Sequence, residues 1–184
     1  MTNDFCSVKD ILNEIEKTAT NVDENKYQQI FQLIKNSDRI FVTGEGRSGL
    51  IGKMFAMRLK HLGFKTYVVG ETITPALTAD DLLVIASGSG ETKKVIVDAK
   101  TAQKTDSKIL LFSASKKSTL SEMASQKIIF SLNHSNQNQL YSEQFGGSLF
   151  EQSLLIFLDS LVSYFQKQLQ INNEDMSKIH TNLE

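Results

Sequence analysis

The chain of 184 residues is 40% apolar and 22% charged, with a formal net charge of −1 at pH 7. This composition is typical of one globular domain, and it disfavours nucleic acid or an anionic membrane as partner. The single cysteine, Cys6, excludes an internal disulfide. No basic-then-apolar leader opens the sequence, and the longest unbroken apolar run in its most apolar stretch is 154–158. We therefore expect a cytoplasmic protein without a membrane span.

Apolar residues at helical spacing predict two helices within residues 1–36, the second with Asp23 as candidate cap. Strands and helices then alternate along the chain. This alternation predicts an α/β fold, a three-layer αβα sandwich of flavodoxin or Rossmann type with a five-stranded parallel sheet. The expected strands are 39–43, 65–69, 82–86, 108–113 and 127–131, and the expected helices are 47–62, 91–105 and 118–125.

Residues 132–147 interrupt this alternation with a polar loop that ends at Gly146-Gly147. A long helix is expected from Ser148 to about Gln168. Its apolar residues cover more than one face, so the helix is either buried or shared with another subunit. Residues 171–184 are polar enough for a tail. The whole chain reads as one domain, with N-terminal helices in 1–36, an α/β core in 37–147 and a C-terminal helix and tail in 148–184.

Two glycine-serine segments, 44–49 and 87–92, each follow an apolar strand and open a helical pattern. Such a turn leaves unpaired backbone N–H groups at the positive end of a helix dipole. Glycines let a ligand approach this backbone, and hydroxyl groups add donors. Tight turns alone explain one such segment more easily than two. The pair therefore indicates a site for a phosphorylated small molecule.

The first of these segments also matches the dinucleotide-binding pattern G-x-G-x-x-G, and Glu71 could serve as the ribose-binding acid. That pattern does not need the second segment, so dinucleotide binding remains an alternative. A nucleotide P-loop is excluded because Leu50 stands where that motif requires lysine.

Several motifs resemble a sugar isomerase domain and, more narrowly, the 6-phospho-3-hexuloisomerase family. They are Gly46-Arg47-Ser48-Gly49, 55–59, Val68 to Pro75, Ser87-Gly88-Ser89-Gly90-Glu91-Thr92, Ser148 to Glu151 and the closing 180–184. Two positions depart from the family pattern. Glu45 replaces a small residue, and Phe145-Gly146 replaces Pro-Met before the last helix. The resemblance implies cofactor-independent interconversion of D-arabino-3-hexulose 6-phosphate and D-fructose 6-phosphate.

This reaction needs an anchor for the phosphate, a base that moves a proton between C2 and C3, and donors for an enediolate oxygen. Helix capping is the alternative role of Ser48 and Ser89, and surface exposure that of Arg47. Together with the resemblance, the loop chemistry predicts phosphate binding by Arg47, Ser48, Ser87, Gly88, Ser89, Gly90, Glu91 and Thr92.

Glu151 is the candidate base, although Ser148 to Glu151 also reads as a capping box. A helix N-terminus stabilises the charged carboxylate, whereas desolvation by Phe150 and Leu154 would act in the opposite direction. The resemblance gives His180 a role in proton shuttling. No cluster of His, Cys and Asp has the spacing of metal ligands, so neither a metal nor another cofactor is expected.

As partners, the resemblance implies a phosphorylated sugar, further copies of the chain in a homotetramer and a functional link to a hexulose-phosphate synthase. A sugar-phosphate sensor is the alternative from another class, because the same loops bind ligand without chemistry. Such sensors usually carry a DNA-binding domain, and residues 1–36 lack the basic residues expected of a helix-turn-helix.

Overall fold

The computed structural model describes residues 6–20, 22–132 and 142–183. Five parallel strands form one sheet in the order β2-β1-β3-β4-β5. The predicted sheet is confirmed, and so are the bounds of its third and fourth strands. The strands are β1 Ile40–Gly44, β2 Thr66–Val68, β3 Leu82–Ala86, β4 Lys108–Ser113 and β5 Gln126–Ile129.

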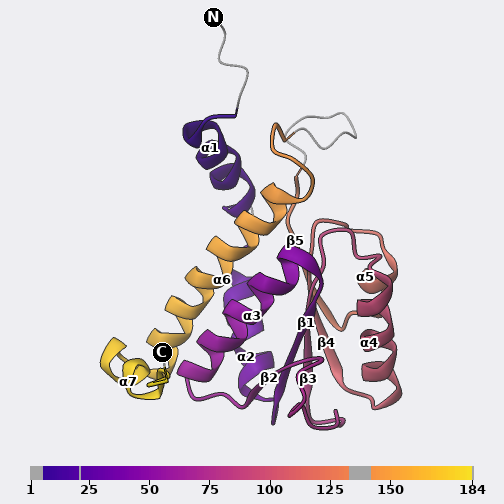
Figure 1. The fold of residues 1–184 in the computed structure, drawn as a ribbon, viewed down its shortest axis with the longest axis vertical. Coiled ribbons are helices and arrows are strands. Elements are labelled where there is room, and N and C mark those ends of the chain that lie inside the picture. The colour runs from indigo at the N-terminus through magenta and orange to yellow at the C-terminus, as the bar shows by residue number, and fades with distance from the viewer. Residues whose placement is uncertain (1–5, 21, 133–141, 184) are drawn as a thin grey trace, which may run out of the picture.

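Helices cover both faces of the sheet, as Figure 1 shows. One face packs against α2 (Asn25–Lys35), α3 (Gly46–His61) and α6 (Ser148–Leu169). The other packs against α4 (Lys93–Lys104) and α5 (Thr119–Met123). Each face of the sheet has its own hydrophobic core. Alternate residues of a strand pack into the two cores, because successive side chains point to opposite faces. Ile40 and Val42 join the first core, and Phe41 between them joins the second.

Helix α1 (Val8–Ala19) packs against the beginning of α6, at the end of the molecule farthest from β2 in Figure 1. The expected polar tail is partly wrong, because residues Asn173–Ile179 form a short helix, α7. Asn172 and Asp175 cap it reciprocally, which explains how so polar a segment becomes helical. The polar loop predicted before α6 lies mostly in 133–141, outside the described residues.

An ion pair joins the amino ends of β1 and β3. The guanidinium of Arg39 donates to both carboxylate oxygens of Asp81, at 2.9 and 2.7 Å. Burial of Asp81 raises its pKa, but the hydrogen bonds from Arg39 and Thr78 outweigh this effect, so the pKa is lowered overall. The adjacent backbone bond from Leu82 N to Arg39 O, at 3.0 Å, continues the connection between the two strands.

Candidate active site

The two glycine-serine segments lie side by side at the carboxyl edge of the sheet. Gly44 at the end of β1 is paired in register with Ala86 at the end of β3. The crossover from β1 leads to β2 on one side, and the chain then returns to β3 on the other. Parallel sheets with this strand order bind their ligands at such a switch point, between β1 and β3.

The first segment leads into α3 without a side-chain cap. Glu45 is the N-cap residue, but its side chain caps nothing. Its carboxylate instead pairs with the ammonium of Lys94, in the first turn of α4, and this hydrogen bond raises the pKa of Lys94. Ser48, in the first turn of α3, is buried and is not the N-cap residue, so the capping alternative is wrong for Ser48.

The second segment is held by its own hydroxyl groups. Ser87 Oγ accepts from Gly90 N at 3.2 Å and lies 3.4 Å from Thr92 Oγ1, and Ser89 Oγ accepts from Glu91 N at 3.2 Å. Thr92 is the N-cap residue of α4, again without a side-chain cap, so Ser89 does not cap this helix either. Gly90 has φ +69°, and a Cβ there would lie 2.1 Å from Ser118 Oγ, so only glycine fits.

Glu91 has a structural partner. Its carboxylate accepts from the backbone N–H of Thr119 at 2.6 Å and from the Thr119 hydroxyl at 2.8 Å. These two hydrogen bonds, the backbone one first, lower the pKa of Glu91. The carboxylate therefore ties the loop to α5, and a phosphate can approach Glu91 only by way of its backbone.

Glu151 faces Arg47 across the first turns of α6 and α3. Oε2 of Glu151 lies 2.5 Å from Nε of Arg47. The contact is an ion pair only, because Oε2 is buried and accepts no hydrogen bond from the described residues. The predicted capping box is wrong: Gly147 is the N-cap residue, and the Ser148 hydroxyl donates to Phe145 O at 2.8 Å.

A cavity of about 440 Å³ opens between the second segment and the start of α6. Gly88, Ser89, Gly147 and Phe150 are among the residues that line it. A Cβ at Gly88 would come within 3.0 Å of the Phe150 ring, and one at Gly147 would lie 3.6 Å from Oε1 of Glu151. The carboxylate of Glu151 thus lies directly beside the wall of this cavity.

His180 lies apart from this group within one chain. It ends α7, and its ring centroid is 5.2 Å from that of His61 in the last turn of α3. Burial lowers the pKa of His61, and the nearby His180 lowers it further. The single chain brings together the other predicted site residues but not His180.

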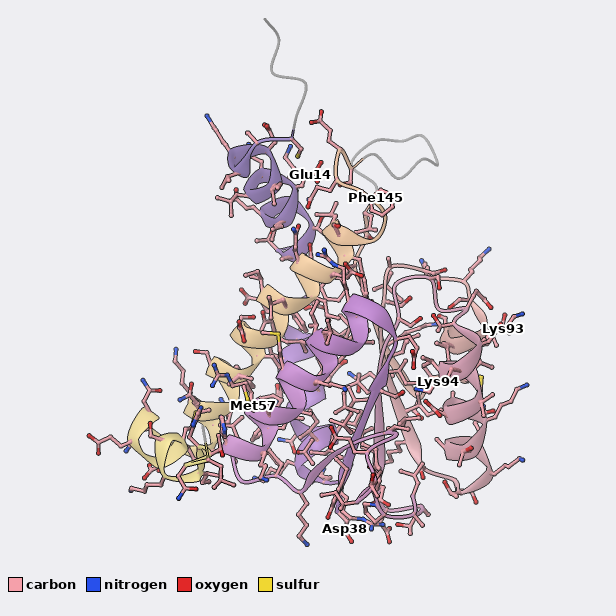
Figure 2. All side chains as sticks on the ribbon, in the orientation of Figure 1. Glu14, Asp38, Met57, Lys93, Lys94 and Phe145 are labelled. Carbon is pink, nitrogen blue, oxygen red and sulfur yellow. The ribbon has the colours of Figure 1, made fainter. Side chains whose placement is uncertain are left out.

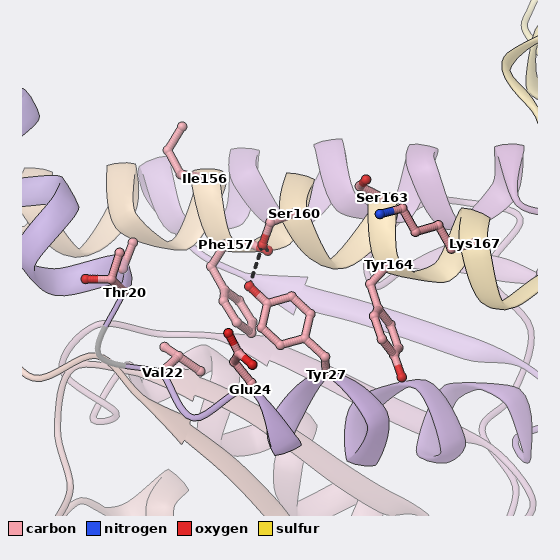
Figure 3. A pocket seen from close by; sticks show the side chains of 11 residues that line it. Thr20, Val22, Glu24, Tyr27, Ile156, Phe157, Ser160, Ser163, Tyr164 and Lys167 are labelled. Atoms are coloured by element: carbon pink, nitrogen blue, oxygen red, sulfur yellow. Dashed lines mark hydrogen bonds between the residues drawn. The ribbon is translucent and has the colours of Figure 1, made fainter.

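A wider cavity of about 610 Å³ lies elsewhere, between α2 and α6 (Figure 3). Tyr27 and Ser160 hydrogen-bond in it at 2.6 Å, and it includes no residue of the two segments. Within the described residues, no three His, Cys, Asp or Glu side chains gather as a metal site. Among the described helices, none has the length and apolarity needed to cross a membrane.

Comparison with known proteins matches residues 33–153 to the SIS domain. The chain is 36% identical to the 3-hexulose-6-phosphate isomerase of Mycobacterium gastri, over all of this chain and 92% of that relative. It is 38% identical to the enzyme of the same name from Bacillus subtilis, over 96% of this chain and 97% of that relative. The chain belongs to the SIS domain family, whose members share this sugar isomerase fold.

A solved structure from Methanococcus jannaschii, for which the function of 3-hexulose-6-phosphate isomerase was inferred, superposes with a TM-score of 0.80. That protein is 37% identical, and the match covers 96% of this chain and 97% of the other. The glycine pattern of the first segment therefore belongs to this family and not to a dinucleotide-binding protein.

Proposed function

We propose that this chain is a phosphosugar isomerase that interconverts D-arabino-3-hexulose 6-phosphate and D-fructose 6-phosphate. The names of the relatives, at 36–38% identity over nearly the whole chain, favour this enzyme over a sugar-phosphate sensor. The observation that carries catalysis is the carboxylate of Glu151, which lies next to a cavity and pairs with Arg47, and whose buried Oε2 accepts no hydrogen bond from the described residues. A sensor has no need for such a carboxylate.

The substrate's phosphate binds at the switch point between β1 and β3. Helices α3 and α4 both begin there without a side-chain cap from the described residues, so their first N–H groups can donate to an anion. The hydroxyls of Ser48, Ser87, Ser89 and Thr92 add donors. Gly88 and Gly90 shape the second segment, while the carboxylate of Glu91 holds it in place.

Glu151 acts as the base in this proposal. It takes the proton from C2 of the 3-hexulose, which leaves an enediolate, and returns it to C3, so that the carbonyl moves to C2. Arg47 holds the carboxylate between α3 and α6 by their ion pair and faces the anionic intermediate with its positive charge. The phosphate role expected for Arg47 is thus secondary to its contact with Glu151.

His180 reaches this site from a neighbouring copy of the chain and moves a proton between the substrate oxygens. We therefore propose a homo-oligomer, a tetramer as in the family pattern, that works in the cytoplasm. A hexulose-phosphate synthase would supply the substrate.

The decisive experiment couples the purified chain to such a synthase. Formaldehyde and ribulose 5-phosphate are supplied, and fructose 6-phosphate is measured with a dehydrogenase-linked assay. The proposal expects product only when both proteins are present. Tight binding of fructose 6-phosphate without turnover would instead indicate the sensor.

A further inference from the structure

Glu14 of α1 accepts three hydrogen bonds from the segment that precedes α6. The donors are Ser142 Oγ at 2.7 Å, Glu143 N at 3.1 Å and Gln144 Nε2 at 2.8 Å. Figure 2 shows Glu14 near Phe145, at the end of the molecule where α1 meets this segment. One carboxylate thus fixes three consecutive residues that lie about 130 positions later in the chain.

The segment that Glu14 fixes is a wall of the candidate substrate cavity. Ser142, Gln144, Gly146 and Gly147 line this cavity together with Gly88 and Ser89. Within this wall, Gln144 N donates a hydrogen bond to Ser142 Oγ at 3.1 Å, which stabilises the turn of the backbone there. Four residues after Gly147 the chain reaches Glu151, so the same wall leads directly into the turn that carries the proposed base.

The hydrogen bonds also orient the Gln144 side chain. A carboxylate only accepts, so it selects the amide nitrogen of Gln144 and leaves Oε1 as an acceptor that no described residue occupies. The substrate of the proposed isomerase is an open-chain sugar, which presents hydroxyl donors along its length. A fixed acceptor on the cavity wall fits these hydroxyls, whereas the phosphate belongs to the two glycine-serine segments.

We infer that Glu14 is a positioning residue, which holds the wall 142–147 so that Gln144 binds the sugar hydroxyls. This inference rests on the proposed function. It assigns to α1, which packs against the beginning of α6, a part in substrate specificity. These three contacts of Glu14 all go to the wall 142–147, so the inference predicts an effect on binding of the sugar chain and not on binding of the phosphate.

The test compares Glu14→Ala and Glu14→Gln with the full-length wild type. Glu16→Ala, an exposed carboxylate on the same helix, is the matched control. We expect Glu14→Ala to raise KM for the hexulose phosphate about tenfold. The variant removes the hydrogen bonds to the Glu14 carboxylate, so the wall no longer holds Gln144 in place for the sugar hydroxyls. The inhibition constant of inorganic phosphate should stay within twofold. Glu14→Gln retains an acceptor, so its KM should lie between the values of the wild type and Glu14→Ala. The KM of Glu16→Ala should equal the wild-type value.

Hydrogen exchange supplies a readout that does not depend on activity. The amides of 142–144 should exchange faster in Glu14→Ala, while those of 87–92 keep their rates. Faster exchange with an unchanged KM would overturn the inference, as would an equal loss of phosphate affinity. An inactive wild type would contradict the proposed function itself, and the exchange rates would still decide whether Glu14 holds the wall.

Discussion

His180 packs against His61, at the opposite end of α3 from Arg47 and its partner Glu151. The fourteen residues from Arg47 to His61 correspond to about 21 Å of helix, at 1.5 Å per residue. The short helix α7 does not bring His180 back along this length. Within one chain the proposed shuttle and the proposed base are therefore too far apart to act on the same substrate.

Mixing two inactive variants should restore activity if a neighbouring copy supplies His180. Glu151→Gln subunits keep the histidine, and His180→Ala subunits keep the carboxylate. After random exchange of equal amounts, about a quarter of the sites formed between subunits contain both groups. We expect about that fraction of wild-type activity, measured after co-refolding. Mixtures that stay inactive despite proven exchange, or a fully active monomer, would rule out the shared site.

Glu151→Gln should reduce turnover without unfolding the protein. The amide keeps the shape of the side chain but cannot take up a proton, so we expect kcat to fall by about 10²–10⁴. Oε2 of Glu151 accepts no hydrogen bond from the described residues and its ion-pair partner Arg47 is largely exposed, so the melting temperature should change little. Glu122→Gln, a first-turn carboxylate of α5, serves as control for both measurements. Equal losses of stability and activity would point to a structural role.

Ser89→Ala and Ser48→Ala should weaken substrate binding more than turnover. Each variant removes a hydroxyl from the proposed phosphate site, which costs about 1–3 kcal/mol for a bond to a charged group. Inorganic phosphate should compete with the substrate in the wild type and raise its melting temperature. If phosphate does neither, the two segments are only turns.

Asp81→Ala should destabilise the fold and leave the activity of the folded enzyme intact. Asp81 is fully buried but the Arg39 side chain is 24% exposed, so the loss of this pair should cost about 1–3 kcal/mol. Denaturant unfolding measures this loss, with the exposed neighbour Asp80→Ala as control.

The same pair predicts a pH dependence. Since the folded pKa of Asp81 is lowered, its contribution is present above about pH 4 and disappears as the pH falls through the folded value. Wild type and Asp81→Ala should therefore differ less in stability at pH 2 than at pH 7. A constant difference would contradict the assignment.

Local patterns were sufficient to predict the sheet. The run 82–86 is apolar throughout, and 109–112 is an apolar run bounded by Lys108 and Ser113, so both strands were predicted to the residue. Helix α4 begins two residues later than expected because Glu91 and Thr92 belong to the loop that Thr119 holds. Helix α7 was not predicted, because a capping box at its N-terminus stabilises it. It has no buried apolar face, so apolar periodicity in the sequence does not reveal it.

The site was predictable only where its residues are neighbours in sequence. The helix begins at Ser148 as expected, but its N-cap residue is Gly147 and not Ser148, so the capping box does not form and Glu151 pairs with Arg47. Neither that ion pair nor the contacts of Glu14 leave a sequence signal, because they join residues more than a hundred positions apart. Such pairs become visible only when the chain is folded.

Arg39 and Asp81 join β1 and β3 at the amino ends of the strands, while the loops after the same two strands hold the proposed phosphate site at the carboxyl ends. Mutations in the loops can therefore change what is bound without loosening the strands. An ion pair at the amino ends of the strands keeps the sheet stable while the loops at the carboxyl ends change in sequence. The fold can therefore acquire new ligands during evolution without losing its ability to fold.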